Sequence, residues 1–131
     1  LEQGKLDKAL TQSTKLIQQY PNTHKIHNLL GSIYFSLNQK DMAAQHFSIV
    51  IELQPNHPHA YNNLGVAYCE IQDYGEAVKN FDKVLELNPE HHMSRAQRAF
   101  AAGQLCDWTK FKEEKYKGIL FFLISNNSSL L

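Results

Sequence analysis

The sequence predicts an all-α fold in which about seven helices stack as antiparallel pairs. The clearest signal is a period: prolines recur at positions 21, 55 and 89, and segments 24–57 and 58–91 align without a gap. Within each segment, apolar and small residues fall three or four positions apart, which is the spacing of one helix face. A unit that repeats in tandem at this length predicts a solenoid, in which each unit packs only on its neighbours.

Each complete segment predicts two helices. In segment 58–91 the first helix carries the stripe Tyr61, Leu64, Gly65, Tyr68 and Ile71, and the second carries Ala77, Phe81, Val84, Leu85 and Leu87. Small residues at matching positions, a glycine in the first helix and an alanine in the second, would let the paired helices approach closely. Pro55 and Pro89 follow the second helices, where a fixed φ and a missing N–H favour a helix end. Asp41 and Asp73 lie at the expected starts of second helices and could cap free N–H groups.

The predicted array covers residues 1–124. Residues 1–23 match only a second helix, residues 92–124 form a degraded terminal repeat, and residues 125–131 are expected to be a flexible tail. In the terminal repeat, Arg98 takes a position that is leucine in both complete segments. A polar residue there suits the end of a solenoid, although a rotation of the helix would also explain it. Because the chain does not begin with methionine, we expect it to be a fragment.

A defined motif runs through both complete segments. In segment 58–91 it reads Tyr61, Leu64, Gly65, Tyr68, Ala77, Phe81 and Pro89, and in segment 24–57 it reads His27, Leu30, Gly31, Tyr34, Ala43, Phe47 and Pro55. This pattern resembles the tetratricopeptide repeat (TPR) family. The resemblance implies a right-handed superhelical solenoid whose first helices line a concave groove that binds a partner.

A second, shorter resemblance lies at the turn of the terminal repeat. The stretch Cys106-Asp107-Trp108-Thr109 is similar to the turn that closes the TPR array of O-linked N-acetylglucosamine transferases. It implies a substrate-selecting array whose catalytic domain lies beyond this fragment. The alternative is that its tryptophan is an ordinary packing residue of an inter-helix turn. Those enzymes carry asparagines two positions before the repeat glycine, where this chain has Asn63 but also Leu29 and Gln97.

The exposed positions of the first helices are the predicted partner-binding groove. They combine amides, a few apolar groups and little net charge: Lys25, Asn28, Ser32, Phe35, His59, Asn62, Asn63, Val66, Cys69, Glu70, Met93, Gln97 and Phe100. Amides both donate and accept hydrogen bonds, so they suit the backbone of an extended peptide. The alternative for any single position is an ordinary solvated helix face.

Composition limits the classes of partner. Lys plus Arg and Asp plus Glu are 13 each, so the formal net charge is zero. No basic excess is present to neutralise nucleic-acid phosphates or to hold the chain on an anionic membrane. The longest apolar run, Ile119 to Ile124, is far shorter than the roughly 20 residues of a membrane span. With no export signal at its start and two cysteines, the chain is expected to be cytoplasmic with reduced thiols.

The sequence predicts neither catalysis nor a cofactor. It has no phosphate-binding glycine loop and no nucleophile elbow. Cys69 and His59 share an expected helix but are separated by about 15 Å of rise, too far for proton transfer. The histidines at 57, 59, 91 and 92 lie in or beside inter-repeat turns without a compact metal-ligand spacing, so no metal site is expected.

One binding mode of TPR modules is also disfavoured. Some modules hold a C-terminal carboxylate with a cluster of lysines, asparagines and an arginine. The lysine and asparagine expected on the first groove helix are Asn28 and Ser32 here, so binding of an Hsp70 or Hsp90 tail is not expected.

The C-terminal part carries more apolar surface than one terminal helix can bury: Phe111, Tyr116, Ile119, Leu120, Phe121, Phe122 and Leu123. We expect a further repeat, a following domain or a second copy of the chain to cover it. The predicted function is a non-catalytic scaffold that binds a protein or an extended peptide. The alternatives are the glycosyltransferase-type array and a module for self-assembly.

Overall fold

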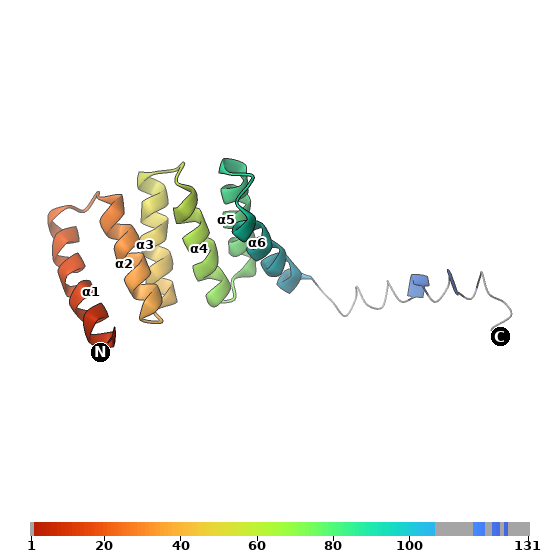
Figure 1. Cartoon of the computed structure of the whole chain (residues 1–131), viewed down its shortest axis with the longest axis horizontal. Coiled ribbons are helices and arrows are strands. Elements are labelled where there is room, and N and C mark those ends of the chain that lie inside the picture. The colour runs from red at the N-terminus through yellow and green to blue at the C-terminus, as the bar shows by residue number, and fades with distance from the viewer. Residues whose placement is uncertain (1, 107–116, 120–121, 124, 126–131) are drawn as a thin grey trace.

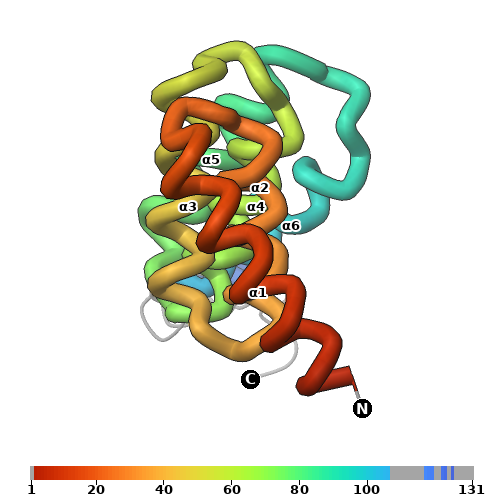
Figure 2. The backbone as a smooth tube through the Cα atoms, turned by 90° about the vertical axis from the view of Figure 1, so that its left-hand side faces the viewer, coloured from red at the N-terminus to blue at the C-terminus, as the bar shows by residue number. Residues whose placement is uncertain are grey.

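The computed structural model describes residues 2–106, 117–119, 122–123 and 125. Within residues 2–106 it contains six helices: α1 (Glu2–Gln19), α2 (His24–Ser36), α3 (Lys40–Leu53), α4 (Pro58–Glu70), α5 (Tyr74–Leu87) and α6 (His92–Leu105). Consecutive helices pack on each other, and α4 also contacts α6, so the chain forms a row of helices (Figure 1). Figure 2 looks along this row with α1 nearest the viewer. The predicted all-α fold is confirmed, and the predicted seventh helix falls mainly on residues outside the described ranges.

A glycine and a phenylalanine set the distance between the helices of each pair. A Cβ atom on Gly31 would lie 2.5 Å from the Phe47 ring, and one on Gly65 would lie 2.7 Å from the Phe81 ring. Both distances are shorter than real Cβ contacts, so only glycine allows the rings to sit there. Phe47 and Phe81 are almost fully buried in consequence. The small residues therefore act as the sequence predicts, by letting the paired helices pack closely.

The turn inside each pair has one geometry. Asn38 and Gln72 occupy equivalent positions and have φ values of 61° and 63°, in the left-handed region. The next backbone N–H in each turn donates to a carbonyl five residues earlier, at 2.8 Å for Gln39 and 2.9 Å for Asp73. This hydrogen bond is the mark of a Schellman ending, which satisfies carbonyls at the end of the first helix.

A second repeated hydrogen bond joins successive repeats. The side chain in the aromatic position of the motif contacts the carbonyl oxygen of the proline six residues before it. His27 Nε2 lies 2.8 Å from the Pro21 oxygen, and Tyr61 donates to the Pro55 oxygen at 2.8 Å. Arg95 donates to the equivalent proline carbonyl at 2.5 Å. Arg95 departs from the motif in sequence, but it makes the same link.

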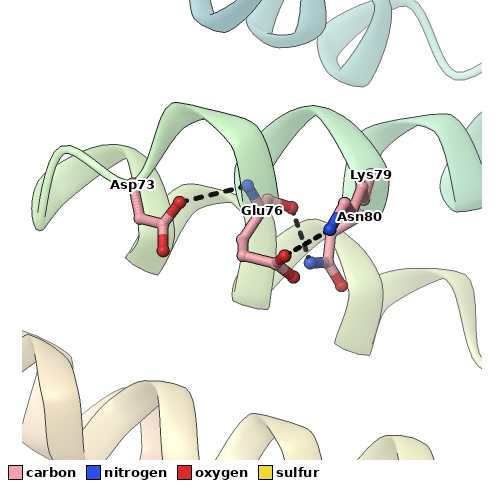
Figure 3. Close-up of polar contacts among 4 residues, drawn as sticks. All are labelled: Asp73, Glu76, Lys79 and Asn80. Atoms are coloured by element: carbon pink, nitrogen blue, oxygen red, sulfur yellow. Dashed lines mark hydrogen bonds and ion pairs between the residues drawn. The ribbon is translucent and has the colours of Figure 1, made fainter.

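Only some of the side chains that cap the helix N-termini are expected from the sequence. Asp73 caps α5, because its Oδ1 accepts from the Glu76 N–H at 3.2 Å (Figure 3). The expected cap at Asp41 is wrong: α3 starts at Lys40, its cap position is Gln39, and Gln39 makes no side-chain cap bond. The α4 and α6 helices are capped by the imidazole rings of His57 and His91. Their Nδ1 atoms accept from backbone N–H groups at 3.2 Å and 3.1 Å, respectively.

Arg98 is not buried like the leucines at its position. Its guanidinium forms an ion pair with Asp82 on α5, and its side chain stays 42% exposed. Leu30 and Leu64, at the equivalent positions, are buried. Arg98 therefore occupies a leucine position without being buried, and its charge is paired with Asp82.

Candidate functional site

Two cavities open along α2, α4 and α6. The first, of about 210 Å³, is lined by Ser32, Phe35, Ser36, Phe47, Asn63 and Val66. The second, of about 340 Å³, is lined by Val66, Cys69, Glu70, Phe81, Ala96, Gln97 and Phe100. We call them the first and second groove cavities. Each is formed by two neighbouring first helices and closed from behind by the phenylalanine of the second helix between them.

The two groove cavities are the same site in successive repeats. Every residue of the first has its partner 34 positions later in the second, and the second adds only Ala96. Val66 borders both cavities, so they are contiguous. The repeat therefore produces a continuous groove with two equivalent subsites. Their shared backbone geometry makes side-chain chemistry the main difference between them.

The polar side chains of the first groove cavity are largely hydrogen-bonded within the protein. The hydroxyls of Ser32 and Ser36 each donate to a backbone carbonyl one turn earlier, at 3.0 Å. The ammonium group of Lys40 lies 3.3 Å from the centre of the Phe35 ring and donates to the Phe35 carbonyl at 2.8 Å. These groups need no ligand to complete their hydrogen bonds.

The second groove cavity is more apolar and carries unmet acceptors. Its Phe100 side chain is 56% exposed and packs edge-on against Tyr74, with ring centres 6.2 Å apart. Gln97 Oε1 is buried and accepts no hydrogen bond from the residues that the structure describes. Glu70 is exposed and forms no ion pair within the same described residues. This cavity has an apolar wall and two acceptor groups without donors.

The asparagines of the predicted groove have different roles. Asn63 lines the first groove cavity and donates to Asn28 Oδ1 at 3.4 Å. Asn62 instead accepts from the hydroxyl of Ser94, a fully buried residue of α6, at 2.7 Å. Asn62 is therefore a link between α4 and α6, and its oxygen is not free for a partner. Sequence spacing alone could not separate these neighbouring residues.

The predicted groove residues fall into two groups. The structure places Ser32, Phe35, Asn63, Val66, Cys69, Glu70, Gln97 and Phe100 on the walls of the two cavities. It places Lys25, Asn28, His59, Asn62 and Met93 outside both linings. Phe47 and Phe81 were not predicted as groove residues, yet they close the cavities from behind. Their contact with the motif glycines is the sequence signal that could have found them.

The histidines serve packing and capping. His27, 6% exposed, has its Nδ1 3.0 Å from Nδ1 of His46 on α3. Burial, and then the charge of His27, lower the pKa of His46 below its ordinary value. Because His27 Nε2 faces a carbonyl oxygen, it must donate there, which leaves His27 Nδ1 to accept from His46. Within the described part of the chain, no cluster of three or more His, Cys, Asp or Glu could hold a metal ion.

Both cysteines are free thiols. Burial and the neighbouring Glu70 carboxylate raise the pKa of the Cys69 thiol above its ordinary value, which keeps it protonated and poorly nucleophilic near neutral pH. Among the described residues, no helix is both long and apolar enough to cross a membrane.

Two predictions fall largely on residues whose structure is not described. Of the turn Cys106-Asp107-Trp108-Thr109, only its exposed first cysteine lies within the described ranges. Of the C-terminal apolar segment, Ile119, Phe122 and Leu123 are described and exposed. The proposed self-association through this segment stays a prediction.

Comparisons with known proteins agree with the repeat pattern. Models of the tetratricopeptide repeat match residues 1–23 and residues 58–91, and a TPR repeat model matches residues 31–71. No protein of curated function matches this chain in sequence.

Solved TPR structures share the fold. The first TPR of Spaghetti (RPAP3), bound to the HSP90 peptide SRMEEVD, has a TM-score of 0.74 and 27% identity, over 79% of this chain and 82% of that one. The first TPR domain of human RPAP3, solved by NMR, has a TM-score of 0.72 and 27% identity over the same shares of the two chains. A MamA structure (MSR-1 C2) gives a TM-score of 0.71 with 24% identity, over 79% of this chain and 60% of that one, which shows a common fold alone.

Proposed function

Because the chain belongs to the tetratricopeptide repeat family, we propose that it is a non-catalytic module that binds an extended segment of a partner protein along α2, α4 and α6. The observation that carries this proposal is the pair of equivalent groove cavities that share Val66. A single extended segment can place side chains in both cavities at once. The solved RPAP3 structure with its HSP90 peptide supports the same general mode, in which a TPR module binds a peptide.

The amides beside the cavities suit a peptide backbone. Asn63 and Gln97 occupy equivalent positions, one on each cavity wall. The Gln97 amide nitrogen can donate to a carbonyl of an extended chain, and the Asn63 amide oxygen can accept from one of its N–H groups. Regular amide positions therefore provide backbone contacts, and the cavities provide side-chain contacts.

A direct experiment compares binding to variants of each cavity. The probes are acetylated, amidated decapeptides with one central leucine in a serine and alanine background, measured by fluorescence anisotropy. Ser32→Arg fills the first cavity and Phe100→Ala removes a wall of the second, so both should weaken binding about tenfold or more. The matched controls are Thr11→Arg, an exposed residue of α1 with the same kind of hydroxyl-to-backbone bond, and Tyr20→Ala, which is similarly exposed. Equal affinity of all four variants, or no binding of any peptide by the wild type, would contradict the proposal.

The partner is not expected to be an acidic C-terminal tail. The residues that line the two cavities include Glu70 and, among the described residues, no lysine or arginine. An acidic peptide with a free carboxylate, such as the SRMEEVD peptide of the RPAP3 structure, finds no lysine or arginine among these lining residues, and the nearby Lys40 is held over the Phe35 ring. We expect the free acid and the amide of that peptide to bind with equal affinity in anisotropy titrations. A preference above tenfold for the free acid, which is about 1.4 kcal/mol, would contradict this expectation.

The alternative of a glycosyltransferase-type array rests on a short sequence resemblance alone. Of the asparagine positions that it implies, only Asn63 on the groove is an asparagine. We therefore place binding of a partner protein first.

A further inference from the structure

We propose that the second groove cavity is a specificity pocket for a lysine or arginine side chain of the bound segment. This inference rests on the proposed function, because it assigns the chemistry that one subsite of the same groove selects. Two features of the cavity lead to it: an apolar wall, and an exposed carboxylate that forms no ion pair among the described residues.

The apolar wall fits the stem of a long basic side chain. Val66 and the exposed ring of Phe100 border the opening, and Phe81 closes the cavity from behind. The methylene groups of lysine or arginine bury well on such a surface while the charged end stays near water. The face of an aromatic ring such as Phe100 also attracts a cation that lies over it.

The exposed carboxylate fits the charged end. Glu70 lines the same cavity and forms no ion pair within the described part of the chain. Lysine and arginine are donors without acceptor atoms, so the charged end of either can pair with this carboxylate while the stem lies on the apolar wall. A neutral side chain would form no such ion pair.

The first groove cavity gives an internal contrast. At the position of Glu70 it has Ser36, whose hydroxyl is already bonded to its own helix. At the position of Gln97 it has Asn63, whose amide is bonded to Asn28. A cation beside it, Lys40, lies over the ring of Phe35. The carboxylate without an ion pair among the described residues is therefore a property of the second cavity and not of the shared repeat geometry.

The test is a positional scan of the leucine decapeptides described above, in which one residue is substituted at a time. Each flanking position carries in turn arginine, its uncharged analogue citrulline, or glutamate, and binding to the full chain is measured by anisotropy at low salt. At one position, arginine should bind about three- to tenfold more tightly than citrulline, and glutamate should bind weakest. The preference should shrink at high salt, because the carboxylate is exposed.

Two variants test whether the preference for arginine over citrulline arises at Glu70. Glu70→Gln should abolish the difference between arginine and citrulline, whereas Glu52→Gln, which removes an exposed carboxylate of α3 outside both cavities, should keep it. Equal binding of the arginine and citrulline peptides to the wild type would overturn this inference and leave the proposed function intact. A preference that survives in Glu70→Gln would also overturn it. Absence of binding by every peptide would overturn the proposed function together with it.

Discussion

In segment 24–57, His27 and His46 hydrogen-bond to each other, whereas segment 58–91 has Tyr61 and Asn80 at the same positions, each bonded to a backbone carbonyl. The apolar frame around these residues hardly differs. In both segments the motif glycine faces a buried phenylalanine, and the turns have a residue in the left-handed region at the same position, Asn38 or Gln72. The comparison teaches that the repeated small and apolar residues set the backbone, while polar positions vary within it. Variation at these positions can therefore change stability, pH response or binding without changing the fold.

The equivalent packing of the two buried phenylalanines predicts that their removal lowers the free energy of unfolding by equal and large amounts. Phe47→Ala and Phe81→Ala each remove a ring that is almost fully buried and leave a cavity, so each should lower the free energy of unfolding by about 3–5 kcal/mol. Urea unfolding followed by helical circular dichroism measures both losses. Phe100→Ala, which truncates an exposed ring, is the control and should cost much less. A loss in one segment below half of that in the other would break the equivalence.

The hydrogen bond between Asn62 on α4 and Ser94 on α6 predicts that two equivalent asparagine substitutions lower stability by unequal amounts. Asn62→Ala leaves the hydroxyl of the buried Ser94 without its acceptor, so it should cost about 1–3 kcal/mol. Asn28 is the equivalent residue, but it faces a groove amide at 3.4 Å, and Asn28→Ala should cost much less. The same urea experiment separates them. Equal costs would show that the α4–α6 link adds nothing to stability.

The helix caps predict that one substitution in segment 24–57 raises the stability and one in segment 58–91 lowers it. Asp73→Gln removes the cap of α5 shown in Figure 3 and should cost about 1 kcal/mol. Gln39→Asp should add a cap to α3 and raise stability by a similar amount, because Gln39 makes no cap bond and an acidic group suits a helix start. Thermal melting of the two variants gives opposite shifts if the turns are equivalent. A loss of stability in Gln39→Asp would show that they are not.

The histidine pair of segment 24–57 predicts a pH response from a contact that segment 58–91 does not contain. The pKa of His46 is lowered on folding, so the unfolded chain binds more protons, and stability falls as the pH drops through the ordinary value of 6.5. Protonation of both rings would bring two Nδ1–H groups together across 3.0 Å.

The double variant His27→Tyr with His46→Asn copies the polar pair of segment 58–91 and serves as the reference. Unfolding free energies of the two proteins at pH 7.5 and pH 5.5 should show a smaller acid loss in the variant, because the remaining histidines are common to both. An equal acid loss in both proteins would assign the response to those other histidines.

The sequence predicts the helix pairs well, because the residues that fix them recur at fixed spacing. Gly31, Gly65 and the two phenylalanines are visible as a pattern before their contact is known. The polar links are different: His27 meets His46, and Asn62 meets Ser94, only because separate helices align side by side in a particular register. Arg95 shows the same limit, since it departs from the motif yet makes the bond to the proline carbonyl that His27 and Tyr61 make in the other repeats. Most of the predicted groove residues line the cavities because their helix face is periodic, but which of them keep free acceptors depends on their neighbours.

The most direct test of the binding groove is the map of backbone amide shifts when the arginine decapeptide saturates the isotope-labelled full chain. The largest shifts should fall on α2, α4 and α6, at Ser32, Asn63, Val66 and Phe100, and Glu70→Gln should reduce those of the second cavity. Residues on the outer side of α3 and α5, such as Glu52 and Glu86, should keep their positions. Shifts confined to those outer residues would contradict binding in the groove.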